Sequence, residues 1–312
     1  MPTPHAEPIE AIELGELECW RIRHGEAELV VARQGAHVIS YKVAGQPVIW
    51  ENEQAVFKHG KPIRGGIPIC WPWFGNFQRN PQSVQAMRQS DEPANAHGEV
   101  RALDWELLGV GHDGDALLVE LVLPEAEGQF PGWPHNVALK LSIRLDHQLH
   151  VSLVCYNAGT ETVTLSQALH SYFAVSDVRQ IHIEGLDGLR YLNTLQSWEE
   201  EQHQDGDLHF TAETDRIYLD TPHHVSIVDP GWQRRIQIMT TGSKSAVIWN
   251  PWIDKTKTFS DMAADGWQGM VCVETANVLG DMVTLAPDDL HTMSVSIWAE
   301  PLAVTEQETL QA

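Results

Sequence analysis

The segment VALKLSIRLDHQLHVSLVC, residues 137–155, shows the clearest periodicity in the chain. Apolar residues occupy every second position from Val137 to Leu145 and again from Leu149 to Cys155. Asp146-His147-Gln148 separates the two runs and is typical of a turn. A period of two is that of a β-strand with one buried face. The segment therefore predicts a β-hairpin.

The same period recurs along the rest of the chain. Shorter runs of this kind lie at residues 18–22, 29–32, 37–43, 116–123, 224–229, 235–239, 245–249, 270–274 and 293–298. Helical periodicity is modest and confined to residues 194–202 and 254–264, and these segments do not alternate with strands as a βαβ protein requires. No linker or change of composition marks a boundary. We therefore expect an all-β fold, a sandwich or a barrel, in a single domain over residues 1–312.

Charge and cysteine usage narrow the possible partners and the compartment. The 312 residues include 20 Lys and Arg against 43 Asp and Glu, a net charge of -23, which repels nucleic acid and anionic membrane surfaces. The four cysteines form no CxxC pair, residues 1–20 lack a signal-peptide pattern, and no apolar stretch approaches the roughly 20 residues needed to span a bilayer. We expect a cytoplasmic protein with neither nucleic acid nor membrane as a partner.

The segment PIRGGIPICWPWFGNF, residues 62–77, is the densest candidate for a binding site. Its glycines and prolines oppose both helix and interior strand, so it predicts a rigid loop with aromatic walls. The aromatic side chains either plug one end of the sandwich or offer a flat face for stacking on a sugar. In the second interpretation Gly65 and Gly66 let the backbone approach a ligand and Arg64 supplies a positive charge.

Three further positions carry candidate chemistry. His97 and Arg101 flank a glycine in HGEVR, and His170 follows a strand-like run in the aromatic setting HSYF. Glu274 ends the apolar run MVCV. A carboxylate at the edge of a buried strand is costly unless it is paired or serves as a base.

Motifs for metal, cofactor and covalent chemistry are absent from the sequence. There is no HExxH and no Cys/His ligand spacing, and no GxSxG, P-loop or GxGxxG occurs. We therefore expect no metal and no cofactor.

Taken together, several motifs resemble one known family. RGGIP followed by CWPWFG, HGEVR, LHSYF, TDRIY at 214–218, WNPW at 249–252 and VCVE ending at Glu274 are similar, in this order, to the glucose-6-phosphate 1-epimerase family. This family belongs to the aldose 1-epimerase, or galactose mutarotase-like, superfamily. The resemblance spans most of the chain. It implies one β-supersandwich domain, with few short helices, that interconverts the α and β anomers of a hexose 6-phosphate without metal or cofactor.

The resemblance also implies roles for individual residues. His170 and Glu274 match the catalytic histidine and glutamate, and Arg64, His97, Arg101 and Asp215 match substrate-binding positions. A carboxylate base and an imidazolium acid suffice to move one proton from the C1 hydroxyl and one to the ring oxygen. Ala96 stands where relatives often have glutamine, which puts the preferred sugar in doubt more than the reaction.

Other functions stay open on the sequence alone. The chain could be an aldose 1-epimerase of free sugars, or a carbohydrate-binding protein without catalysis. A glycoside hydrolase is less well supported, because it requires two carboxylates and Glu274 has no partner within a motif. We expect a monomer that acts on a small sugar phosphate.

Overall fold

The computed structural model describes residues 9–124, 130 and 132–302. Within them the chain forms strands β1 to β24 and two short α-helices, α1 (Gln82–Gln85) and α2 (Trp252–Thr256). Four 3-10 turns complete the regular structure: η1 (Phe77–Arg79), η2 (Val100–Ala102), η3 (Gly266–Gly269) and η4 (Leu279–Asp281). In the part of the chain that is described, no helix has the length and apolar character needed to cross a membrane.

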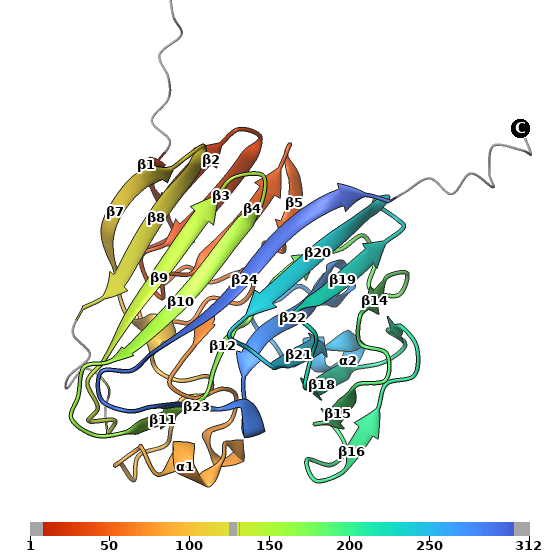
Figure 1. Ribbon diagram of the computed structural model, residues 1–312. Coiled ribbons are helices and arrows are strands. Elements are labelled where there is room, and N and C mark those ends of the chain that lie inside the picture. Colours follow the sequence, from red (N-terminus) through yellow and green to blue (C-terminus); the bar gives the residue numbers. More distant parts are fainter. Residues whose placement is uncertain (1–8, 125–129, 131, 303–312) are drawn as a thin grey trace, which may run out of the picture.

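A thirteen-stranded sheet forms one layer of the protein (Figure 1). Its main path follows the order β1 (Ile9–Leu14), β2 (Leu17–His24), β3 (Ala27–Ala32), β4 (Val38–Val43), β5 (Gln46–Ile49), β13 (Tyr172–Ala174), β22 (Met270–Asn277), β21 (Ser245–Asn250), β18 (Thr214–Leu219), β15 (Arg190–Asn193) and β16 (Glu201–His203). Beside this path, β12 (Gln167–Leu169) pairs with β22 and with β6 (Ile69–Cys70).

A nine-stranded sheet forms the second layer. Its order is β17 (Leu208–His209), β14 (His182–Glu184), β19 (His224–Asp229), β20 (Arg234–Thr241), β24 (Leu290–Pro301), β10 (Leu149–Asn157), β9 (Val137–Leu145), β8 (Ala116–Leu123) and β7 (Glu106–Asp113). A two-stranded sheet joins β11 (Val163–Leu165) to β23 (Val283–Leu285). All strand pairs within these sheets are antiparallel.

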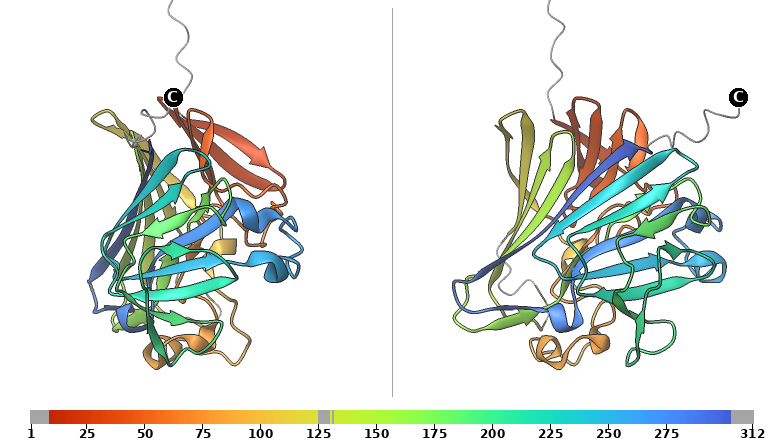
Figure 2. Two further views of the ribbon diagram at one scale, coloured as in Figure 1. Left: turned by 90° about the vertical axis from the view of Figure 1, so that its right-hand side faces the viewer. Right: turned by 45° about the vertical axis from the view of Figure 1, so that its right-hand side comes forward.

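The two large sheets pack against each other over one apolar core (Figure 2). Leu141 and Val151 reach it from the nine-stranded sheet, and Tyr41, Phe173 and Val273 reach it from the thirteen-stranded sheet. Alternation along β9 and β10 buries one face of each strand in this core, as their sequence predicted. The predicted all-β sandwich is therefore confirmed, and each of the period-two runs named above is a strand whose ends are shifted by three residues or fewer.

The modest helical periodicity over residues 194–202 does not correspond to a helix in the structure. Asn193 Oδ1 accepts a hydrogen bond from the Leu195 amide, and Ser197 Oγ accepts one from the Glu199 amide. Short polar side chains that bond to nearby backbone amides favour turns over helices. The segment forms a turn and then enters β16.

The predicted helix over residues 254–264 is much shorter in the structure. Helix α2 begins at Trp252 and ends at Thr256. The Thr256 hydroxyl bonds back to the Trp252 carbonyl, and the Thr258 hydroxyl bonds to the Lys255 carbonyl. These side-chain bonds compete with continuation of the helix, so the chain leaves it as an irregular segment.

A small apolar cluster covers the face of β1 to β4 that points away from the main core. Cys19 and Ile39 belong to it, and Phe57 and Ile63 of the segment 52–63 pack onto it. Gln34 holds the same segment through bonds to the Gly60 amide and the Lys61 carbonyl. The segment that leads into Arg64 is therefore anchored at several points.

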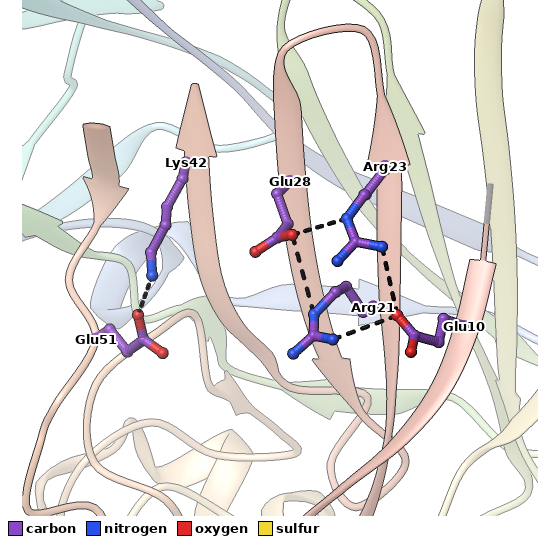
Figure 3. A network of polar contacts seen from close by, with 6 residues as sticks. All are labelled: Glu10, Arg21, Arg23, Glu28, Lys42 and Glu51. Carbon is purple, nitrogen blue, oxygen red and sulfur yellow. Dashed lines mark hydrogen bonds and ion pairs between the residues drawn. The ribbon is translucent and has the colours of Figure 1, made fainter. Parts of the chain in front are cut away.

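A network of ion pairs lies on β1 to β4 and the residues that follow β5 (Figure 3). Arg21 and Arg23 both contact Glu10 and Glu28, and Lys42 contacts Glu51 at 2.7 Å. Each exposed pair contributes little to stability. The network holds equal numbers of positive and negative groups, so the net charge of -23 arises elsewhere in the chain.

Candidate active site

A cavity of about 710 Å³ lies on the face of the thirteen-stranded sheet that points away from the main core. All six residues predicted from the sequence line it: Arg64, His97, Arg101, His170, Asp215 and Glu274. Their segments are far apart in the chain, and the fold brings them together. Which of them act on substrate remains a prediction.

Strand register places His170 beside Glu274 at the base of the cavity. β12 ends with Leu169 opposite Thr275. The same register, continued by one residue, sets His170 opposite Glu274, and β13 resumes it two residues later. His170 Nε2 lies 3.4 Å from Glu274 Oε1. A cross-strand pair in a central sheet therefore holds the two candidate catalytic groups.

A second row of residues crosses the same face of the sheet. Tyr172 lies opposite Cys272, which lies opposite Trp249, and Trp249 lies opposite Asp215 on β18. Tyr172, Trp249 and Asp215 line the cavity. The rings of Tyr172 and Trp249 meet edge to face with their centroids 6.0 Å apart. This aromatic pair forms an apolar wall with two ring faces at nearly a right angle, next to the His170–Glu274 pair.

Both candidate catalytic side chains are deeply buried and incompletely hydrogen-bonded. Glu274 is 1% exposed and His170 is 9% exposed. Glu274 Oε2 and His170 Nδ1 lack a hydrogen-bond partner among the described residues. Burying a carboxylate without a partner costs stability, so the arrangement indicates a group held for use.

The surroundings lower the pKa of His170 and raise the pKa of Glu274, so the pair tends to hold a single proton. Burial lowers the pKa of His170 well below its ordinary value of 6.5, and neighbouring His97 and Arg101 lower it further. Burial raises the pKa of Glu274 well above 4.5, and the negative charge of Asp215 adds to this rise. His170 therefore resists a second proton and Glu274 retains the last one. Such a pair can donate a proton at one atom and accept a proton at the other.

The RGGIP segment positions Arg64 at the rim. His37, whose pKa burial lowers to about 4, is neutral and donates from Nε2 to the Gly65 carbonyl at 2.8 Å. Gly66 has φ +69°, and a Cβ there would lie 2.2 Å from the Val38 carbonyl oxygen. The sequence predicted that this glycine lets the backbone approach a ligand, whereas the structure shows it approaching β4. The glycine fixes the loop so that Arg64 faces the cavity.

Two contacts hold the Arg64 side chain. Its Nε donates to Asp261 Oδ1 at 2.9 Å, and its guanidinium lies 3.9 Å from the centroid of the Phe259 ring. All three residues line the cavity.

The HGEVR segment is pinned beside the second aromatic loop. A Cβ at Gly98 would lie 1.9 Å from the Trp71 carbonyl oxygen, so only glycine permits this approach. Arg101 Nη2 donates to the Ala96 carbonyl, and its buried Nε has no partner among the described residues. The N–H at Arg101 Nε therefore donates no hydrogen bond within the described part of the chain.

His97 also has a defined orientation. Its Nδ1 accepts a hydrogen bond from the Gly75 amide at 3.3 Å and lies 3.3 Å from Cys70 Sγ. Burial and the charges of Arg101 and Arg64 lower the pKa of His97 to about 3. The ring is neutral, and because Nδ1 accepts, Nε2 carries the proton. His97 is thus a neutral hydrogen-bond donor 5.4 Å from His170, measured between ring centroids.

Sequence reasoning missed several cavity residues. Trp71 and Trp73 are 0% and 1% exposed and pack in the core, as one of the two interpretations of their loop predicted, and the indoles that line the cavity are those of Trp198 and Trp249. Tyr172 stacks on His170 with centroids 4.8 Å apart and an 8° angle between the rings. Its position two residues after His170, on the same face of the chain, was a usable signal. Asp261 lies in an irregular segment whose sequence carries no such signal.

Comparisons with known proteins show the family of the chain. A sequence model of the aldose 1-epimerase family matches residues 18–298. The chain belongs to the aldose 1-epimerase family. The resemblance to that superfamily inferred from the motifs is thereby confirmed.

Individual members of the aldose 1-epimerase family are similar to this chain over most of its length. A protein of Escherichia coli K12 named "Putative glucose-6-phosphate 1-epimerase" is 33% identical over 266 residues, which is 85% of this chain and 84% of the relative. A protein of the same name from Cenchrus ciliaris is 30% identical over 96% of this chain and 90% of its own length. The crystal structure of a protein described as a putative mutarotase from Salmonella typhimurium superposes with a TM-score of 0.83 at 27% identity, covering 96% of this chain and 95% of that one.

The raised pKa of the buried Glu274 carboxyl leads to a prediction about stability. Because the pKa of Glu274 is raised by folding, the folded state keeps a proton that the unfolded state loses above pH 4.5. The free energy of unfolding therefore falls as the pH rises, by up to about 1.4 kcal/mol per pH unit for one proton. Glu274→Gln cannot ionise, so the variant should gain stability over the wild type from pH 5 to pH 8. Urea unfolding at several pH values measures this.

Glu13→Gln is the matched control for this prediction. Glu13 is exposed on β1, so its replacement should leave the pH dependence of unfolding unchanged. An equal pH dependence in Glu274→Gln and the wild type would contradict the raised pKa.

Proposed function

We propose that this member of the aldose 1-epimerase family interconverts the α and β anomers of hexose 6-phosphates, with glucose 6-phosphate as the substrate tested first. The observation that carries the proposal is the His170–Glu274 pair at 3.4 Å, at the base of a cavity that two arginines also line. The relatives named as glucose-6-phosphate 1-epimerases support the choice of sugar.

The pair accounts for ring opening and reclosure. Glu274 takes the proton of the C1 hydroxyl while His170 delivers a proton to the ring oxygen. The bond from C1 to the ring oxygen breaks and the C1 carbonyl forms. After rotation about the C1–C2 bond, the ring oxygen attacks the other face of the carbonyl, and both protons return. The pair starts and ends with one proton. Burial favours that proton on Glu274, so it must pass to His170 before Glu274 acts as the base, and the 3.4 Å between Nε2 and Oε1 allows this transfer.

Recognition of the phosphate falls to Arg64 and Arg101. The net charge of -23 opposes the approach of an anion, so close contacts must provide the binding energy. Arg101 offers an Nε–H that has no hydrogen-bond partner among residues 9–124, 130 and 132–302, and Arg64 has further guanidinium N–H groups beyond the Nε that Asp261 uses. His97, as a neutral donor, can bind a sugar oxygen, and Asp215 can accept from a sugar hydroxyl.

Ala96 departs from the family pattern, and its surroundings support a different use of the position. Its carbonyl accepts a hydrogen bond from Arg101, and the residue lines the cavity. The methyl side chain makes no polar contact with a sugar. We propose that this position widens the cavity and relaxes the choice of hexose.

The other functions have less support. A carbohydrate-binding protein gains nothing from a buried carboxylate with an unpartnered oxygen, which costs stability. A glycoside hydrolase uses two carboxylates as its catalytic pair, whereas Glu274 is paired with the imidazole of His170 at 3.4 Å. An epimerase of free sugars remains the closest alternative, and the experiment below separates it from the proposal.

We also propose that the chain is a single domain and a monomer. One cluster of buried residues runs from Ile22 on β2 to Ile297 on β24, which supports one folding unit. Size-exclusion chromatography with light scattering tests the monomer.

Anomer exchange followed by NMR magnetisation transfer tests the proposed function. We expect purified protein to accelerate exchange of glucose 6-phosphate over the buffer rate, and to act more slowly on free glucose and galactose. Faster exchange of a free sugar would assign the protein to the free-sugar epimerases. No acceleration of any hexose or hexose phosphate would refute the proposal.

A further inference from the structure

A third side chain with a metal-binding atom lies against the His170–Glu274 pair. The donor atoms of His170, Cys272 and Glu274 all lie within 4.8 Å of one another, and all three residues are buried. Cys272 and Glu274 are two residues apart on β22, so their side chains share a face of the sheet. His170 lies opposite Glu274, which completes a triangle of nitrogen, sulfur and oxygen.

The geometry of this triangle fits a small divalent cation. Zn²⁺ binds nitrogen, sulfur and carboxylate oxygen at about 2.0 to 2.3 Å, which places ligands of a tetrahedral site roughly 3.3 to 3.8 Å apart. The 3.4 Å between His170 Nε2 and Glu274 Oε1 falls in this range. Sulfur and imidazole ligands favour zinc and similar soft ions over Mg²⁺ or Ca²⁺.

A second observation points to a ligand at the same place. Glu274 Oε2, on a side chain 1% exposed, has no hydrogen-bond partner among the described residues. His170 and Glu274 both line the cavity, which leaves a fourth coordination position open to water. Three protein ligands with one open position is the usual arrangement at an accessible zinc site.

We infer that His170, Cys272 and Glu274 form a binding site for Zn²⁺ and similar thiophilic divalent cations, and that its occupation inhibits the enzyme. Inhibition rests on the proposed function, because the ion would take the lone pairs that the acid–base pair needs. Binding itself does not rest on it. The ion displaces protons from Cys272 and from the pair to the solvent, so no oxidant or reductant is involved.

The mechanism gives Cys272 no part, which makes it the informative residue. Cys272 is 0% exposed, and the rings of Tyr172 and Trp249 occupy the neighbouring positions on both adjacent strands. Its thiol is therefore shielded from the cavity on that side and is reached from the side of His170 and Glu274.

Another cluster in the described chain is a weaker candidate and serves as a control. His182, Glu184 and Asp207 also bring three donor atoms within 4.8 Å. Arg235 already binds both carboxylate oxygens of Glu184, and the group is more exposed. A cation there would have to compete with that ion pair.

Titration of metal-free protein with Co²⁺ tests the site without using activity. We expect one Co²⁺ per chain and a thiolate-to-cobalt charge-transfer band, which Zn²⁺ abolishes by competition. Cys272→Ser should lose the band, and Glu274→Gln should weaken binding by at least about 100-fold, since loss of a supporting group outside the ligand set already costs 10- to 100-fold. Cys19→Ser, which removes a buried thiol far from the site, and His182→Ala should both retain the band.

The outcomes separate this inference from the proposed function. Zn²⁺ should slow anomer exchange by the wild type, chelator should restore it, and Cys272→Ser should need at least about 100-fold more Zn²⁺ for half-inhibition. Absence of the band, its persistence in Cys272→Ser, or its loss only in His182→Ala would overturn the inference. Activity lost on chelation and restored by metal would also overturn it. If metal-free protein binds Co²⁺ as expected but exchanges no anomers, the proposed function fails and the metal site stands.

Discussion

Glu274→Gln and His170→Ala should each lower kcat/KM for anomer exchange of glucose 6-phosphate about 10²- to 10⁴-fold. Each variant removes one end of the proton transfer, and the buffer rate sets the lower limit of what can be measured. Because the two groups lie 3.4 Å apart and act together, the double variant should be little slower than either single variant. Magnetisation transfer by NMR measures all three rates.

His150→Ala is the control for the loss of an imidazole. His150 is partly buried on β10, and its ring contacts Ser296 at 2.8 Å on the sheet that does not carry the cavity. Its removal should leave the rate unchanged. A rate near that of the wild type in either single variant would remove that residue from the mechanism.

The second large effect concerns the two arginines. Arg64→Ala or Arg101→Ala should lower kcat/KM for glucose 6-phosphate about 10- to 100-fold, because a hydrogen bond to a charged group contributes about 1.5 to 3 kcal/mol. Exchange of free glucose should change little, since it presents no phosphate. The ratio of the rates for glucose 6-phosphate and glucose, measured side by side, shows whether the arginines bind the phosphate.

Arg144→Ala separates phosphate binding from net charge. Arg144 pairs with Asp113 and Asp146 on the nine-stranded sheet, so its loss changes the charge by the same unit far from the cavity. It should leave the ratio of the two rates unchanged. Equal losses on both sugars in the Arg64 and Arg101 variants would mean that these arginines organise the cavity and do not select the phosphate.

The sequence predicted strands well because period-two alternation reflects burial on one face. β9 was predicted with both ends correct. β22 is buried on both faces, so its sequence shows no alternation and indicates a strand only through the apolar run MVCV. The weak helical periodicity over 194–202 does not lead to a helix, because the side chains of Asn193 and Ser197 bond to nearby backbone amides. Such bonds favour turns, and the spacing of apolar residues gives no information about them.

The site was predictable through motifs and not through strand patterns. Six cavity residues lie in segments that resemble a known family, yet nothing in the local sequence shows that His170 faces Glu274, because pairing of distant strands sets that register. Asp261 and Cys272 were missed for different reasons. Asp261 lies in a segment with only modest helical periodicity, which does not indicate a binding residue, and Cys272 resembles any other apolar residue in a buried strand.

Glu274 lies on the central strand β22 and His170 lies between β12 and β13, which both pair with β22, whereas Arg64, Arg101 and Asp261 come from segments outside the main strands. Changes of length or sequence in those outer segments can therefore alter which sugar is held without moving the atoms that carry the proton. Grafting the 257–265 segment of a relative with another sugar preference should change the ratio of KM values and leave the pH profile in place. The reaction thus depends on the sheet and the choice of sugar depends on the outer segments. New substrates can therefore arise in evolution by changes in these segments while the sheet stays the same.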